Sequence, residues 1–110
     1  MTFTVWRDMP AHLVALVDEV IDPAGLQQYA GGAAELMARF GGRYLFASFG
    51  PRSLEGGGAV PQAIAVAEFP DADRIQAFWH APEYVPLREL RQRSARVRIY
   101  VADAPPAAPA

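Results

Sequence analysis

The side chain most suited to acid–base chemistry is Glu68, which comes near the end of the otherwise apolar run Ile64–Phe69. A carboxylate in such a strand must be paired, or have its pKa raised, if it is buried. Arg43 and Arg91 are its candidate partners. The functional interpretation is that Glu68 and Arg91 are catalytic, as a general base and an anion-holding group. The structural interpretation is an ion pair that ties a helix to the sheet.

Aromatic side chains and a histidine follow Glu68 and could line a pocket for a small molecule. Trp79 and Tyr84 could hold a planar ligand, and Tyr29 could donate its hydroxyl from a facing helix, although aromatic residues at this spacing also pack in cores. His80 is expected near a helix end, where an imidazole can titrate or bind metal. With His12 it shares no motif, so we expect no metal site. Haem binding through His80 is a further alternative.

The composition excludes several classes of protein. The 110 residues contain no cysteine, which removes disulfides, thiol nucleophiles and thiolate metal sites. With a net charge of -2 and no recognised binding module, the arginines of residues 88–98 are interpreted as a solvated face and no nucleic-acid partner is expected. No apolar stretch is long enough for a signal peptide or a membrane span. We therefore expect a cytoplasmic protein without a membrane partner.

Four strands and two helical regions are predicted to position these residues. Apolar runs and alternation predict strands over 12–18, 43–49, 62–69 and 96–102. The first helix begins at Asp22-Pro23, where Asp22 can cap and Pro suits the first turn, and it ends at Gly41-Gly42. Gly31 and Gly32 inside it predict a kink or a close approach by a backbone or a ligand. A second helical region begins at Asp71, restarts at Pro82 and runs to about Ser94.

The remaining segments are a glycine-rich loop and two ends. Gly56-Gly57-Gly58 lacks the Lys-Ser/Thr ending of a phosphate loop and is interpreted as a flexible hairpin tip. Residues 1–11 are expected to form an arm or edge strand, and residues 12–102 the folded domain. The Ala/Pro-rich residues 103–110 are expected to be disordered.

The order strand, helix, strand, strand, helix, strand predicts an α+β, ferredoxin-like βαββαβ fold. Such a fold has a four-stranded antiparallel sheet with both helices on one face. In the first three strands both faces are apolar. Because helices cover only one face, a second copy packed on the other is the economical solution and predicts a homodimer. The N-terminal arm folding across its own sheet is the alternative cover.

The chain resembles the DUF1330 family, small domains of unknown function in the dimeric α/β-barrel superfamily. The resemblance covers about His12 to Val101 and departs from the family pattern at Ala81 and at Gly31-Gly32. It rests on Asp22-Pro23, Tyr29, Gly41-Gly42-Arg43-Tyr44, Leu54-Glu55-Gly56, Glu68-Phe69-Pro70, Trp79, Pro82-Glu83-Tyr84 and Arg91.

The resemblance implies a dimeric α/β barrel with a cleft between the helices and the sheet, and no established reaction. The expected ligand-binding residues are Tyr29, Arg43, Trp79, His80 and Tyr84. The most consistent chemistry is cofactor-free isomerisation or oxygenation of a small organic acid or aromatic, with no cofactor expected. A non-catalytic ligand-binding or assembly module is the alternative. The sequence leaves open which sheet face Glu68 occupies.

Overall fold

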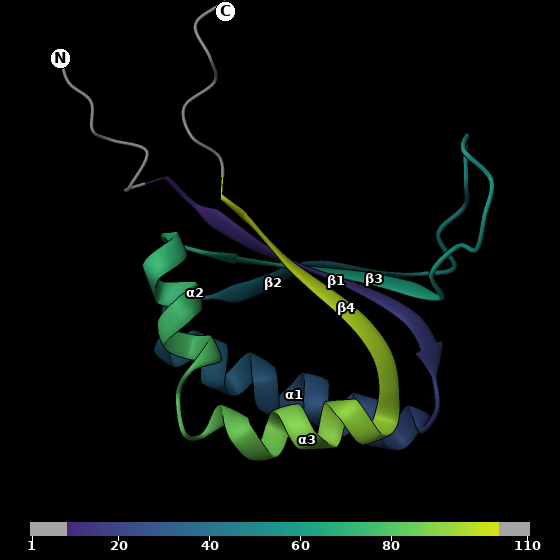
Figure 1. Cartoon of the computed structure of the whole chain (residues 1–110). Coiled ribbons are helices and arrows are strands. Elements are labelled where there is room, and N and C mark those ends of the chain that lie inside the picture. The colour runs from purple at the N-terminus through teal and green to yellow at the C-terminus, as the bar shows by residue number, and fades with distance from the viewer. Residues whose placement is uncertain (1–8, 104–110) are drawn as a thin grey trace, which may run out of the picture.

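A computed structural model describes residues 9–103 and confirms the ferredoxin-like order of elements (Figure 1). The expectations for residues 1–8 and 104–110 lie outside the described residues. Asp103, expected in the tail, belongs to the last strand. The elements are β1 (Ala11–Val20), α1 (Pro23–Arg39), β2 (Arg43–Phe49), β3 (Ala63–Phe69), α2 (Ala72–Trp79), α3 (Tyr84–Ser94) and β4 (Ala95–Asp103).

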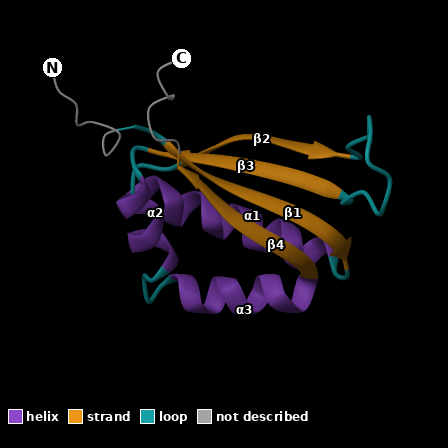
Figure 2. Cartoon of the chain, turned by 45° about the horizontal axis from the view of Figure 1, so that its top comes forward, coloured by secondary structure: helices purple, strands orange, loops and turns teal. Residues whose placement is uncertain are grey.

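The four strands form one antiparallel sheet in the order β2-β3-β1-β4. All three helices lie on the same side of it (Figure 2). Successive side chains of a strand alternate between the two faces. In β1, Leu13, Ala15 and Val17 face the helices, and His12 and Val14 face away from them.

A β-bulge in β2 changes which side of the sheet its residues face. The register with β3 shifts between Tyr44 and Phe46, so Tyr44 pairs with Ala67 whereas Phe46 pairs with Val66. Strict alternation would place Tyr44 and Phe46 on one face. The extra residue at Leu45 instead puts Tyr44 on the helix side with Ala47, and turns Phe46 outward.

The helix boundaries follow from caps and prolines. Pro23 occupies the first turn of α1, but the Asp22 side chain makes no capping hydrogen bond, contrary to expectation. The Arg74 amide donates to the Asp71 carboxylate at 2.8 Å, which caps α2 as predicted. Pro82 separates α2 from α3, because its ring cannot sit inside a continuous helix.

The two glycines in α1 do not kink it, since the helix continues without interruption to Arg39. A side chain at Gly32 would bring its Cβ within 2.6 Å of Leu87 Cδ2 on α3, whereas nothing lies within 4 Å of the same position at Gly31. The close approach at Gly32 is therefore to the Leu87 side chain of α3, and not to the backbone or ligand that the sequence predicted.

An aromatic cluster holds α2 and α3 against the sheet. Phe78 packs on Phe69 and Tyr84, with ring centroids 5.5 and 4.7 Å away, and these three residues are almost fully buried. Each such ring contributes about 2–3 kcal/mol through its burial. This cluster packs the space between the sheet and the helices at the end next to α2. The space at the other end is less tightly packed.

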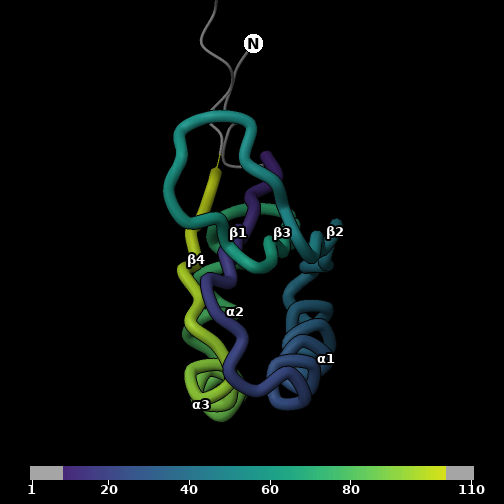
Figure 3. The backbone as a smooth tube through the Cα atoms, turned by 90° about the vertical axis from the view of Figure 1, so that its right-hand side faces the viewer, coloured from purple at the N-terminus to yellow at the C-terminus, as the bar shows by residue number. Residues whose placement is uncertain are grey.

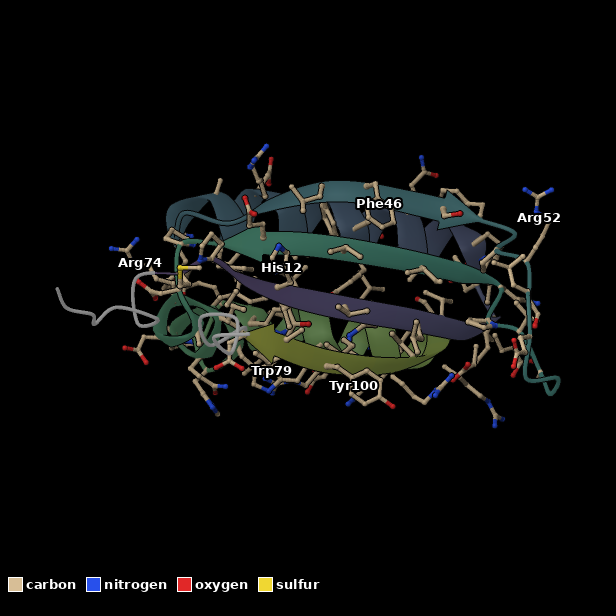
Figure 4. The ribbon with its side chains drawn as sticks, turned by 90° about the horizontal axis from the view of Figure 1, so that it is seen from above. His12, Phe46, Arg52, Arg74, Trp79 and Tyr100 are labelled. Atoms are coloured by element: carbon tan, nitrogen blue, oxygen red, sulfur yellow. The ribbon has the colours of Figure 1, made fainter. Side chains whose placement is uncertain are left out.

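The outer face of the sheet, on the side away from the helices, is uncovered in the described part of the chain. Figure 4 looks down on it, with His12, Phe46 and Tyr100 labelled. Phe46 and Tyr100 are 53% and 51% exposed. Val66 and Val14, both half-buried, lie between them on the two central strands. The apolar second face inferred from the sequence is therefore present.

Candidate functional site

Alanines form the floor of a cavity between the sheet and the helices. Ala15 of β1 and Ala47 of β2 both pair with Ala65 of β3, so a row of methyl groups crosses three strands. Ala63 and Ala67 extend this floor along β3. Because such short side chains cannot fill the space below the helices, a cavity of about 360 Å³ remains. That volume suits a small organic molecule.

The cavity opens near the hairpin that joins β2 and β3. Its walls at this end include Val20, Leu26 and Phe49, and the Phe49 side chain is 82% exposed although it lines the cavity. Ala47 beside it is also exposed. A ligand can therefore reach the interior from this side, over wholly apolar walls.

Among residues 9–103, Arg91 is the only charged residue in the cavity lining, and it is buried, with 7% of its surface exposed. Its guanidinium carbon lies 5.7 Å from the ring centroids of both Tyr29 and Trp79. Its Nε has no hydrogen-bond partner, and no described residue forms an ion pair with it. Among the described residues, this buried guanidinium contacts two aromatic rings but no carboxylate, so its charge has no counter-charge there.

Three tyrosines place hydroxyl groups near this arginine. The hydroxyls of Tyr29 and Tyr84 are 2.7 Å apart, and either can be the donor. Burial, assisted by Tyr84, raises the pKa of Tyr29 well above its ordinary value. Burial also raises the pKa of Tyr44 to about 12. The hydroxyls of Tyr29 and Tyr44 therefore stay protonated at neutral pH and can act as hydrogen-bond donors.

Arg88 fixes the position of Trp79 in the cavity wall. Its guanidinium carbon lies 5.0 Å from the indole centroid, and its Nη2 donates to the Trp79 carbonyl at 2.7 Å. The same guanidinium lies 5.1 Å from the ring centroid of Tyr84. Arg88 does not line the cavity. It therefore supports the aromatic wall from behind.

The cavity can stabilise negative charge but contains no evident proton acceptor. Its lining includes no aspartate, glutamate or histidine. The described residues also contain no cluster of three His, Cys, Asp or Glu side chains that could hold a metal. Its polar groups are one cation and neutral hydroxyl and indole donors, an arrangement that favours an anionic oxygen.

Glu68 lies on the opposite face of the sheet. It pairs with His12 and Arg43 in the neighbouring strands, with N–O distances of 3.3 Å to each. The expected partnership of Glu68 with Arg91 across a pocket is not present. Of the two candidate partners, Arg43 is the one that donates a hydrogen bond to Glu68. The reason is strand parity: Glu68 shares the outer face with Val66, and the alternating alanines face the cavity.

His80 is at the C-terminal end of α2 and does not line the main cavity. It borders a separate hollow of about 190 Å³ together with Gln76 and Trp79. Of the expected ligand-binding residues, the structure thus brings Tyr29, Trp79 and Tyr84 together around Arg91. It leaves Arg43 on the outer face and His80 at the protein surface.

Two features of the site were not predicted from the sequence. Tyr44 was assigned only to a strand and to a family motif, because its cavity side depends on the bulge. The alanine floor was treated as ordinary apolar strand. The signal for it was available: Ala63, Ala65 and Ala67 place the smallest apolar side chain at every second position of β3.

The arginines of residues 88–98 do not form one basic patch. Arg88 and Arg91 point toward the aromatic cluster, as described above. Arg96 pairs with Glu19 at 3.0 Å, and Arg98 forms two hydrogen bonds to Asp18 at 2.6 and 2.8 Å. These pairs neutralise part of the charge on β4, in line with a solvated face.

Residues 10–105 match the family described as Domain of unknown function (DUF1330). The chain belongs to this family. No curated protein matches this DUF1330 domain in sequence. None of the described helices is both long and apolar enough to cross a membrane.

Solved structures similar to this DUF1330 domain share its fold at low sequence identity. RPA0582, a protein of unknown function from Rhodopseudomonas palustris, is 19% identical, with a TM-score of 0.72 over 89% of this chain and 84% of that one. SnoaB, a cofactor-independent oxygenase from Streptomyces nogalater, is 14% identical, with a TM-score of 0.65 over 93% and 99%. A dimeric ferredoxin-like protein of unknown function from Thermobifida fusca is 14% identical, with a TM-score of 0.59 over 94% and 99%.

Proposed function

We propose that this DUF1330 domain binds a small, mostly apolar organic acid in its ionised form, with the charge at Arg91. The observation that carries the proposal is the buried, unpaired guanidinium facing an apolar cavity of about 360 Å³. Taking a charge out of water costs several kcal/mol unless a counter-charge compensates it. A ligand that brings an anionic oxygen supplies the missing counter-charge, so the cost is recovered on binding.

The hydroxyl groups in the cavity also favour a ligand with an anionic oxygen. In the Tyr29–Tyr84 pair one hydroxyl donates to the other, and the second O–H is left to donate elsewhere. Tyr44 and the indole of Trp79 are further donors in the lining. One cation and several donors, with no carboxylate in the lining, favour a carboxylate, phenolate or enolate over an amine or a neutral amide. The alanine floor and apolar walls accept the hydrocarbon part.

Cofactor-free oxygenation of the bound anion is a second candidate function, favoured by the absence of a base in the cavity lining. An ionised phenol or enol is electron-rich enough to react with dioxygen directly. A ring or enol carbon that carries a hydrogen forms a C–O bond to dioxygen, and a proton from solvent completes the hydroperoxide. Loss of the C–H proton and cleavage of the O–O bond then release water and leave a carbonyl, so the ligand itself supplies all four electrons. Arg91 would assist by holding the ionised form. The fold similarity to SnoaB, a cofactor-independent oxygenase, supports this chemistry.

Assembly as a homodimer through the outer face completes the proposal. The apolar centre of that face, around Val14, Val66 and Phe46, is larger than single exposed residues and has no cover in the described chain. A second copy packed sheet to sheet would bury it. Similar structures described as dimeric support this arrangement. In such a dimer Glu68, Arg43 and His12 belong to the interface and not to the ligand site.

Calorimetric titration with a matched pair of probes tests the ligand class. Naphthoate and naphthamide have the same ring system, but only the carboxylate carries charge. We expect the wild-type protein to bind naphthoate at least about tenfold more tightly, the difference that one charge-assisted contact supplies. Arg91→Met should remove this preference while leaving the free protein as stable or more stable, because an uncompensated charge is lost.

Glu68→Gln is the control for this titration. It removes a charge from the outer face and leaves the cavity lining unchanged, so the affinity for naphthoate should match that of the wild type. Equal binding of the two probes by the wild-type protein would refute the proposal. Loss of naphthoate binding in Glu68→Gln with the fold intact would restore Glu68 to the site.

A further inference from the structure

The loop that joins β2 to β3, residues 50–62, projects from the sheet without contacts that explain its apolar side chains. We call this segment the hairpin arm. Leu54 within it is fully exposed, at 102% of its reference area, and Val60 is 42% exposed. Within the arm, the Ser53 hydroxyl donates a hydrogen bond to the Glu55 carbonyl at 3.2 Å. The Leu54 side chain is therefore free to contact another molecule.

The arm rises on the outer-face side of the sheet, away from the helices. Figures 1 and 3 both show it beyond the hairpin end of the sheet, on the side opposite to α1 and α3. Its base is fixed to β1: the Gln62 amide donates to the Val17 carbonyl at 2.7 Å, and the Val20 amide donates to Gln62 Oε1 at 2.8 Å. The arm therefore cannot cover its own cavity without breaking these bonds or crossing the end of the sheet.

The length of the arm suits a neighbour on the outer face. About six residues out and six back give a reach of about 20 Å when extended. Two sheets packed face to face lie about 10 Å apart. The arm is thus long enough to pass the full depth of a facing sheet. Phe46, 53% exposed, gives the outer face of β2 an apolar surface that such a neighbour would cover.

We propose that the hairpin arm is a clasp that packs Leu54 onto a second copy of this chain. The inference rests on the homodimer in the proposed function and adds a specific contact to it. A second copy on the outer face is the occupant because the arm and the uncovered apolar strands lie on the same side of the sheet. Gly56, Gly57 and Gly58, all with positive φ, give the turn of the arm a backbone that other residues adopt only with strain.

Site-directed cross-linking tests the clasp cleanly because the chain has no cysteine. Leu54→Cys carrying a photoreactive benzophenone label would be prepared as isotopically heavy and light chains, mixed and irradiated. We expect cross-linked peptides that join a heavy chain to a light one. Ala34→Cys, on the exposed surface of α1, is the matched control and should give none. Cross-links confined to single chains, or none in a sample that sediments as a dimer, would overturn the clasp.

A second measurement separates the clasp from the assembly on which it rests. Leu54→Ser should raise the dissociation constant of the dimer about tenfold in sedimentation, the effect of losing one leucine-sized apolar contact. An unchanged dissociation constant would contradict the clasp and leave the homodimer standing. A wild-type protein that sediments as a monomer would contradict both. Naphthoate binding, measured separately, would still decide the ligand proposal.

Discussion

The hydroxyl oxygens of Tyr29 and Tyr84 lie 2.7 Å apart and join α1 to α3 beside the cavity. Both side chains are buried, and their rings meet edge to face with centroids 6.3 Å apart. The pair has two consequences: it links the two long helices, and it leaves one O–H directed toward other partners. Structure and ligand recognition therefore depend on the same two residues.

Tyr84→Phe should lower the free energy of unfolding by about 1–2 kcal/mol, because the buried Tyr29 hydroxyl loses its partner. Urea unfolding of the single variants and of Tyr29→Phe/Tyr84→Phe measures this. Once the pair is broken, the second substitution should cost less than it does alone. Fully additive effects would show that the hydroxyls do not interact.

Stability at high pH should depend on Tyr44. Burial raises the pKa of Tyr44 from its ordinary value of 10.0 to about 12, so the folded state holds this proton more tightly than the unfolded chain does. Its contribution is complete below about pH 10 and is lost as the pH rises through about 12. Absorbance titration of the wild type and Tyr44→Phe should differ by one tyrosine that ionises near pH 12. A difference near pH 10 would mean that Tyr44 is not buried as described.

Ala65→Leu should fill the cavity without damaging the fold. Ala65 lies in the middle of the alanine floor, so the larger side chain occupies empty space and should hold or raise the melting temperature. Naphthoate binding should be lost. Ala33→Leu is the contrast: Ala33 is fully buried in the packed core and does not line the cavity. That change should cost about 1–3 kcal/mol by overpacking. Equal destabilisation by both would mean that the floor is closely packed.

The two glycines of α1 should respond oppositely to alanine. Gly31→Ala adds a methyl group in open space and should raise the free energy of unfolding by about 0.5–1 kcal/mol. Gly32→Ala would place its Cβ 2.6 Å from Leu87 Cδ2, so Leu87 must move and the gain is reduced or reversed. Thermal unfolding of both variants decides this, and a larger gain at Gly32 would contradict the close packing of α1 against α3.

The fold was predictable because each element has its own local signal. Asp22-Pro23, Asp71 and Pro82 mark helix boundaries, and the apolar runs have strand length. These signals need no knowledge of distant residues. The order of elements then leaves few topologies, and the four-stranded antiparallel sheet with its helices on one face is confirmed.

The site was only partly predictable because the smaller side chains of β3, and not the larger ones, face the helices. Large apolar residues normally face the helices, but here Val66 faces outward and the alanines on either side of it line the cavity. The alternation of side chains along β3 therefore did not indicate on which face of the sheet Glu68 lies. Trp79, Tyr84 and Tyr29 were identified as pocket candidates from local patterns, whereas the position of Tyr44 depends on a bulge that the sequence does not mark.

Ionisation of bound naphthol tests the central claim most directly, because the two possible environments have opposite effects. An apolar cavity alone disfavours the charged form and raises the pKa of a bound phenol, whereas a buried guanidinium lowers it. We predict that naphthol bound to the wild-type protein ionises at lower pH than in buffer, as read from its long-wavelength absorbance. In Arg91→Met it should ionise at higher pH than in buffer. A raised naphthol pKa in the wild-type complex would contradict the account of Arg91 as the anion-binding group.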